Sequence, residues 1–156
     1  MERIQSFCVD HDYITEGIYI SRIDGDVTTF DMRTRKPNCG DYMDNITMHS
    51  LEHMFATYIR NSAIGDRVIY FGPMGCRTGF YLLTRDLEPS VVLGEVILAL
   101  RAIVAHEGGV FGATRKECGN YLELDIVAAK TEAARYLEAL ESRDNDFVYP
   151  SGEVAE

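Results

Sequence analysis

Residues 47–59, TMHSLEHMFATYI, combine a helical repeat of apolar side chains with a pair of histidines. Residues three and four positions apart lie on the same face of a helix. Apolar side chains recur at this spacing at Met48, Leu51, Phe55, Tyr58 and Ile59. The pattern predicts a helix from about Thr47 to Asn61 whose apolar stripe packs on a core. Thr47 or Asn45 is the expected N-cap.

The same helix carries two imidazoles and one carboxylate on adjoining positions. His49 and His53 are four residues apart, so both can reach one metal ion, and Glu52 stands between them. At 100° per residue Glu52 falls within the apolar stripe, where a carboxylate is costly unless it is paired, ligated or functional. The order H-x-x-E-H also occurs in inverzincin metallopeptidases. Two histidines on a helix flank can instead simply cap, solvate or pair with carboxylates, but their place here favours a site at the core edge.

The rest of the chain alternates strand and helix signals. Strands are expected at Gly17–Ile23, Val27–Arg33, Arg67–Phe71 and Thr78–Thr84, and further helices at Val91–Ala105 and Ile126–Ser142. The first two strands flank the turn Asp24–Asp26 and form a hairpin. Pro89 suits the first turn of a helix that is apolar nearly all round and is therefore expected to be buried. The order predicts an α+β fold, an antiparallel sheet packed against helices in one domain, residues 1–143, with a polar, frayed tail, residues 144–156.

Composition narrows the class of protein. The 156 residues are 46% hydrophobic and 26% charged, which is typical of one globular domain. A net charge of −10 argues against binding to nucleic acid or to an anionic membrane surface. No signal-peptide core or membrane span is expected, so the sequence predicts a cytoplasmic protein. Its four cysteines are then expected to be thiols or metal ligands.

Two of these cysteines stand in glycine-containing segments. Gly75 precedes Cys76 and allows close approach of a ligand, while the arginine that follows can favour the thiolate. A buried structural thiol is the alternative. Cys118 can complete a ligand set with His49 and His53 and leave a fourth position open, as in catalytic metal sites.

Several short motifs, spread over most of the chain, occur together. They are Ser6–Phe7 with Asp10–His11, Asp31–Arg33 with Pro37–Asn38, His49–His53, Gly72–Tyr81 and Glu117–Tyr121. In these motifs, from about residue 4 to residue 140, the chain resembles the S-ribosylhomocysteine lyase (LuxS) family. It departs from many members at Tyr70-Phe71-Gly72, where they carry Asp-Ile-Ser. The aspartate that would contact the substrate's amino group is therefore absent, and a backbone carbonyl or another acid could replace it.

The resemblance implies a role for each matched position. The metal ligands would be His49, His53 and Cys118, the general acid/base pair Cys76 and Glu52, and the residues near the substrate Arg33, Ser6, His11, Phe7 and Gly75. The metal would be Fe(II), replaceable by zinc or cobalt. Family members are homodimers with active sites at the subunit interface, so Ser6 and Phe7 are expected to serve the partner's site.

The implied reaction cleaves the small molecule S-ribosylhomocysteine. The products are homocysteine and 4,5-dihydroxy-2,3-pentanedione, the precursor of autoinducer-2, which connects the activated methyl cycle to quorum sensing. Two other functions remain open from the residues. One is a metallopeptidase-like hydrolase, for which Glu117 is available as a ligand. The other is a structural metal-binding module for protein interaction, which would need a closed four-ligand site and no Cys76 or Glu52.

Overall fold

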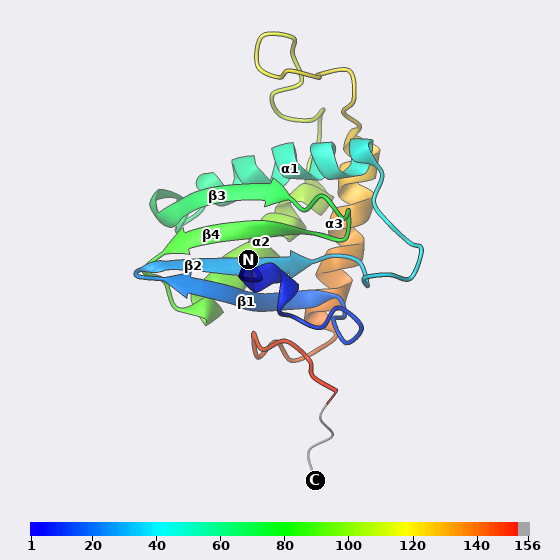
Figure 1. Cartoon of the computed structure of the whole chain (residues 1–156). Coiled ribbons are helices and arrows are strands. Elements are labelled where there is room, and N and C mark those ends of the chain that lie inside the picture. Colours follow the sequence, from blue (N-terminus) through cyan, green and yellow to red (C-terminus); the bar gives the residue numbers. More distant parts are fainter. Residues whose placement is uncertain (153–156) are drawn as a thin grey trace.

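The computed structural model describes residues 1–152, which form a sheet covered by helices on one side (Figure 1). The elements are η1 Gln5–Phe7, β1 Gly17–Asp24, β2 Val27–Arg33, α1 Asn45–Arg60, η2 Gly65–Arg67, β3 Val68–Pro73, β4 Gly79–Arg85, α2 Pro89–Ala105 and α3 Ile126–Glu141. The strand order is β1-β2-β4-β3, and every neighbouring pair is antiparallel. The predicted α+β fold is therefore confirmed.

The two faces of the sheet have different environments. Alternate residues of the central strands, such as Phe30, Phe80 and Leu82, are fully buried beneath the helices. The α1, α2 and α3 helices lie behind the sheet in Figure 1, and the N-terminal segment with η1 lies in front. Because successive side chains point to opposite faces of a strand, the front face receives Asp31 of β2 and its register partner Tyr81 of β4.

Helix α1 begins earlier than its apolar pattern suggests. The N-cap is Asp44, whose carboxylate accepts a hydrogen bond from the backbone N–H of Thr47 at 2.7 Å. The prediction of Thr47 or Asn45 was wrong because Asp44 is extended and its side chain reaches the free amide at the third helical position. That cap fixes the first turn of the helix that carries both candidate histidines.

Strand β3 also runs further than expected, through Gly72 to Pro73, which pairs with Phe80. A proline has no N–H to donate, but β3 is an edge strand, where this loss is tolerated. The strand therefore continues directly into the turn that carries Cys76.

Helix α2 is amphipathic and not buried all round. Val92, Val96 and Leu100 are buried in the core, whereas Val91 and Leu98 are exposed. Only one stripe of this helix meets α1 and α3, so the prediction of a fully buried helix was wrong. None of the helices within residues 1–152 has the length and apolar character needed to cross a membrane.

The described part of the C-terminal tail is not frayed. Phe147 forms a parallel bridge with Tyr19, and the N–H of Ile20 donates to the carbonyl of Phe147 at 2.8 Å. The prediction of a frayed tail was wrong for these residues, because the tail is held by backbone pairing with the edge of β1, which its polar composition does not reveal. Residues 153–156 lie outside the described residues, and the division at residue 143 stays a prediction.

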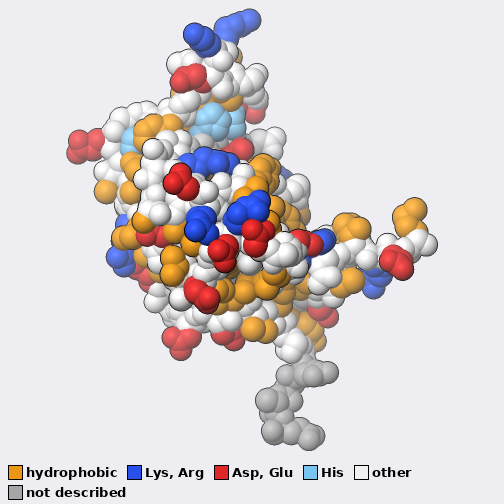
Figure 2. Space-filling model, turned by 90° about the vertical axis from the view of Figure 1, so that its left-hand side faces the viewer, with side chains coloured by type: hydrophobic (Ala, Val, Ile, Leu, Met, Phe, Trp, Pro, Cys, Tyr) orange, Lys and Arg blue, Asp and Glu red, His pale blue; other side chains and the backbone are white. Residues whose placement is uncertain are grey.

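The end of the sheet that carries the β1–β2 turn is covered by charges of both signs (Figure 2). Arg22 pairs with Asp24, Arg85 with Asp26 and Arg67 with Asp86. Exposed pairs of this kind contribute little stability. This end is a solvated surface whose arginines are already paired.

Candidate metal centre

His49, His53 and Cys118 come together although they belong to two distant segments. Both histidines lie on α1, and Cys118 lies in the segment between α2 and α3 that projects beyond the helices (Figure 1). One donor atom from each residue lies within 4.8 Å of the others. The Sγ of Cys118 is 3.3 Å from Nε2 of His49, and the imidazole centroids are 4.6 Å apart. The structure thus assembles the three residues that the sequence suggested as ligands.

Both imidazoles are oriented by backbone carbonyls. Nδ1 of His49 lies 2.9 Å from the carbonyl oxygen of Glu123, and Nδ1 of His53 lies 2.8 Å from that of Phe111. A carbonyl can only accept, so each Nδ1 must donate its proton, and Nε2 is left with its lone pair free. Second partners of this type fix the tautomer and the ring orientation of metal-binding histidines.

The donor set suits a divalent transition metal. Two imidazole nitrogens and one thiolate are typical ligands of iron and zinc, and three protein ligands leave a coordination position for substrate. Within residues 1–152 the group contains no carboxylate. The carboxylate of Glu117 instead accepts a hydrogen bond from Thr114 at 2.6 Å. The arrangement therefore favours neither the peptidase, which needs a carboxylate ligand, nor a closed structural site.

Glu52 is half-buried on α1, between the two histidines in sequence. In the described part of the chain its carboxylate forms no ion pair and no hydrogen bond. A carboxylate at the edge of the core without a neutralising partner is costly for stability. This environment is consistent with an acid/base role, which stays a prediction.

Cys76 lies in the turn between β3 and β4 and is exposed. The turn is closed by the N–H of Met74, which donates to the carbonyl of Gly79 at 2.9 Å. The Sγ of Cys76 lies 3.0 Å from Oγ1 of Thr78 and 4.0 Å from Nη1 of Arg33. The alternative of a buried structural thiol is therefore wrong.

The arginine beside the thiol in space is not its neighbour in sequence. Arg77 adopts a left-handed conformation, with φ of 63°, and its guanidinium lies 5.6 Å from the ring centre of Tyr42. Arg33 faces Cys76 instead, with its side chain only 3% exposed. Burial alone would lower the pKa of Arg33, but attraction to Asp31 outweighs it and raises the pKa. A permanent positive charge is thus fixed beside the sulfur.

The Cys76 turn is tied to the segment that leads into α1. The N–H of Thr34 donates to the carbonyl of Thr78, and the N–H of Met43 donates to the carbonyl of Arg77, each at 3.0 Å. Figure 1 shows this turn and the start of α1 at the same edge of the molecule. Backbone pairing therefore joins the thiol-bearing turn to the metal-binding helix.

The N-terminal site candidates line two other hollows. Ser6 lines one of 520 Å³ on the front face of the sheet, together with Tyr70 and Tyr81. Phe7 and His11 line a neighbouring one of 480 Å³. Neither lining includes Cys76 or a member of the metal group. A single chain, in the described residues, therefore does not bring these candidates to the metal group.

Gly75 leaves open space beside the thiol. A Cβ atom at this position would meet no other heavy atom within 4 Å. The glycine is therefore not required by packing within the chain, and the space is compatible with the predicted approach of substrate. The place of Gly75 near the substrate stays a prediction.

Sequence reasoning missed the partners that hold the site together. His106 lies 2.8 Å from the hydroxyl of Tyr58 and 3.0 Å from the carbonyl of Gly109, so it fixes the segment that supplies the Phe111 carbonyl to His53. Such long-range contacts leave no local pattern. The pairing of Asp31 with Arg33 could have been predicted from the sequence, because residues two positions apart in a strand lie on the same face.

Taken as a class, this is an α+β protein in which a helical histidine pair and a loop cysteine could hold a metal ion, and in which an exposed thiol lies beside a buried arginine. Residues 4–147 match the family model described as S-ribosylhomocysteinase (LuxS), and the chain belongs to this family. Proteins named S-ribosylhomocysteine lyase are similar over nearly their whole length. The one from Phocaeicola vulgatus is 44% identical, covering 96% of this chain and 97% of the relative. Those from Clostridium beijerinckii (40%; 97% and 100% covered) and Borreliella burgdorferi (39%; 96% and 100% covered) follow.

Proposed function

We propose that this chain is a carbon–sulfur lyase that converts S-ribosylhomocysteine into homocysteine and 4,5-dihydroxy-2,3-pentanedione. Membership of the family and the names of its relatives support the substrate and the reaction. The structural observation that supports this assignment is that the donor atoms of His49, His53 and Cys118 lie within 4.8 Å of one another. The family supports lyase chemistry, and the three-residue donor group is suited to metal assistance of that chemistry.

The chemistry requires several proton transfers. The thioether sulfur leaves only when a carbonyl activates the carbon next to the C–S bond. The sugar carbonyl must first move from C1 to C2 and then to C3, and each move takes a proton from one carbon and returns it to its neighbour. Loss of the C4 proton then expels homocysteine thiolate from C5, and the thiolate takes up a proton. The enol that remains between C4 and C5 becomes the second ketone when its hydroxyl loses a proton and C5 gains one. The sequence consumes no water and no oxidant, so the two products together contain the atoms of the substrate.

In this scheme Cys76, as a thiolate, removes and returns the carbon-bound protons. Arg33 stabilises the negative charge on its sulfur, from 4.0 Å away. Glu52 exchanges the protons on oxygen and delivers one to the departing sulfur. Positioned acid and base groups each contribute about 10²–10⁴-fold in rate.

His49, His53 and Cys118 would hold the metal, which we propose to be Fe(II), with zinc or cobalt as possible substitutes. When bound, a metal of this kind supplies Lewis-acid polarisation of the migrating carbonyl. The hydrogen bonds from the two Nδ1 atoms to Glu123 and Phe111 keep both imidazoles pointed for this task.

We further propose that the active form is a cytoplasmic homodimer in which the N-terminal segment of one subunit completes the site of the other. Ser6, Phe7 and His11 line hollows separate from the metal group in a single chain. Phe7 is 64% exposed and Tyr70 is 51% exposed at these hollows, so both side chains are accessible to a partner subunit.

The direct test is release of free thiol from S-ribosylhomocysteine, followed with a thiol-reactive chromophore. We expect the iron-loaded wild-type chain to release one thiol per substrate consumed, with the diketone detected in equal amount by derivatisation. Cys76→Ala should abolish release, while Cys39→Ala, which removes another exposed thiol, should not. Absence of thiol release by the metal-loaded wild type would refute the proposed reaction.

A further inference from the structure

The C-terminal tail is connected to the candidate catalytic thiol through buried side chains. The hydroxyl of Tyr149 donates a hydrogen bond of 2.7 Å to Oδ2 of Asp31, 118 positions earlier in the chain. Asp31 is 1% exposed, and its two carboxylate oxygens accept from Nη2 and Nε of Arg33 at 2.6 and 3.1 Å. Through Tyr149 the tail therefore contacts the carboxylate that holds Arg33 on the side away from the thiol.

The other side of Arg33 faces the thiol. Its Nη1 donates to Oγ1 of Thr78 at 2.8 Å and lies 4.0 Å from Sγ of Cys76. Oγ1 of Thr78 is itself 3.0 Å from that sulfur. The guanidinium is thus fixed on one edge by Asp31 and on the other by the Cys76 turn, and any rotation of the carboxylate would move the positive charge relative to the sulfur.

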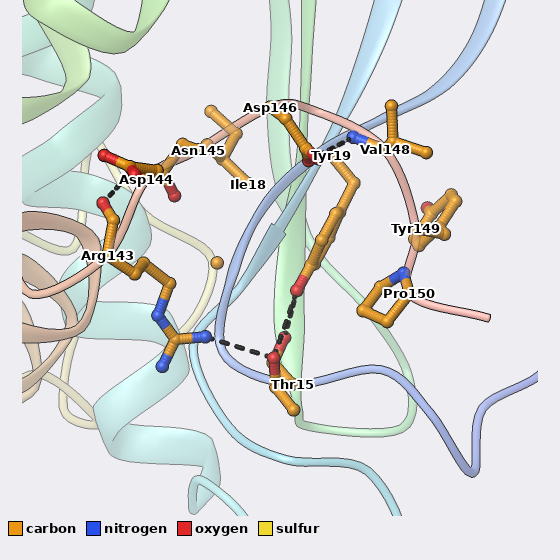
Figure 3. Close-up of a pocket in the computed structure, with 11 residues that line it drawn as sticks. Thr15, Ile18, Tyr19, Arg143, Asp144, Asn145, Asp146, Val148, Tyr149 and Pro150 are labelled. Carbon is orange, nitrogen blue, oxygen red and sulfur yellow. Dashed lines mark hydrogen bonds between the residues drawn. The ribbon is translucent and has the colours of Figure 1, made fainter. Parts of the chain in front are cut away.

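Tyr149 is held firmly enough to act on Asp31. Its ring stacks on Tyr19, with centroids 4.9 Å apart and planes at 21°. Figure 3 shows residues 143–150 crossing over the start of β1, with Arg143 on one side of a hollow of 290 Å³ and Tyr149 and Pro150 on the other. Arg143 donates to Oγ1 of Thr15 at 3.0 Å, so the tail is attached at both ends of this hollow.

The hydroxyl of Tyr149 remains a donor at all working pH values. Burial, and after it the neighbouring Asp31 carboxylate, raise the pKa of Tyr149 well above its usual value. Burial also raises the pKa of Tyr81, which lies opposite Asp31 in the β2–β4 register, and that of Tyr136, which is near Asp31 as well. These tyrosines therefore stay neutral at working pH, and the charged pair next to them is Arg33 with Asp31.

We propose that Tyr149 is a positioning residue for the lyase reaction, which acts through Asp31 to keep the Arg33 guanidinium beside Cys76. The Tyr149 hydroxyl donates to Oδ2 of Asp31. Without this hydroxyl, a water molecule could take its place as the donor to Oδ2. Without it, the Asp31 carboxylate gains freedom to rotate, and Arg33 loses its fixed distance to the sulfur. The proposal rests on the proposed function only in assigning Cys76 as the reactive thiol.

The test compares two tyrosines of the same stack. Tyr149→Phe removes the bond to Asp31 but keeps the ring on Tyr19. Tyr19→Phe removes a hydroxyl that donates to the carbonyl of Thr15 and not to Asp31, so it is the matched control. The readout is the rate of iodoacetamide alkylation at Cys76, measured by mass spectrometry of its peptide against pH, with exposed Cys39 as internal reference.

We expect Tyr149→Phe to slow alkylation of Cys76 near neutral pH by about tenfold, the effect of losing one hydrogen bond in a buried charged network. The difference should vanish in alkali, where the thiol ionises without help, and Cys39 should be unaffected. In the holoenzyme kcat should fall by a similar factor, with KM and metal content unchanged. Tyr19→Phe should match the wild type in every measurement.

Tyr149→Leu, which also removes the stacked ring, separates positioning from simple packing. Equal slowing in the Phe and Leu variants supports the proposal. Slowing only in the Leu variant, or alkylation within twofold of wild type in Tyr149→Phe, overturns it. Alkylation requires no turnover, so an altered alkylation profile in a chain without lyase activity would refute the proposed function and leave the positioning role standing.

Discussion

The Sγ of Cys118 lies 3.3 Å from Nε2 of His49, although 69 positions separate the two residues. One belongs to a rigid helix and the other to a segment without regular structure. The metal group therefore depends on how that segment is fixed, through the Glu123 and Phe111 carbonyls and the His106 contacts.

The first prediction concerns the metal ligands. Replacing His49, His53 or Cys118 by alanine should remove the divalent ion and the activity together, because two remaining ligands hold a metal weakly. Elemental analysis should give one ion per subunit in the wild type and little in each variant. Affinity should fall in acid, since protons compete with the metal for thiolate and imidazole. Full occupancy in Cys118→Ala would contradict the assignment.

The second prediction separates the two proton carriers. Cys76→Ser and Glu52→Gln should retain the metal but lose turnover by about 10²-fold or more. Without Cys76 the carbon-bound protons cannot move, so exchange of solvent deuterium into substrate carbons should cease. Without Glu52 the carbonyl should still shift slowly, and a ketone intermediate should accumulate in carbon-13 spectra.

Two results would change these roles. Near-normal turnover in either variant would remove that residue from the mechanism. Loss of metal in Glu52→Gln would instead make Glu52 a ligand or a support for the ligands.

The third prediction tests the shared site. Ser6→Ala and Cys76→Ala, each inactive alone, should recover activity when mixed and allowed to exchange subunits. One intact site in each heterodimer gives roughly a quarter of wild-type activity for a twofold-symmetric dimer. As a control, Ser6→Ala mixed with Phe7→Ala should recover nothing, because both changes affect the same N-terminal segment. A fully active monomer in sedimentation would contradict the shared site.

The fourth prediction concerns the cap of the metal-binding helix. Asp44→Ala should lower the free energy of unfolding by about 1 kcal/mol at neutral pH. The hydrogen bond from the Thr47 backbone lowers the pKa of Asp44 in the folded chain. The cap therefore stabilises fully above the unfolded value, near 3.8, and its contribution is lost as the pH falls through the lower folded value.

Urea unfolding of wild type and Asp44→Ala measures this difference. The gap should be constant from neutral pH down to the unfolded pKa and should narrow below it. Asp66→Ala, which removes an exposed aspartate outside the helix, is the charge-matched control and should leave stability nearly unchanged. A gap that persists undiminished in strong acid would exclude the carboxylate as the cap.

The sequence by itself determined the architecture, and it identified the metal-ligand candidates and the reactive side chains of the site. Alternation of side chains marked the Gly17–Arg33 hairpin, and the apolar repeat from Met48 to Ile59 marked α1. These signals are local, because a strand repeats every two residues and a helix every 3.6. His49 and His53 could be paired for the same reason, and Cys76 and Cys118 were singled out by the segments that contain them.

Only the tertiary structure decided which groups meet. Arg33, and not the adjacent Arg77, faces Cys76, because the β3–β4 turn points Arg77 toward Tyr42 while β2 carries Arg33 beneath the thiol. The tail pairs with β1 and delivers Tyr149 to Asp31 across 118 positions. Contacts of this kind depend on the three-dimensional path of the chain and on burial, so no repeating pattern in the sequence predicts them.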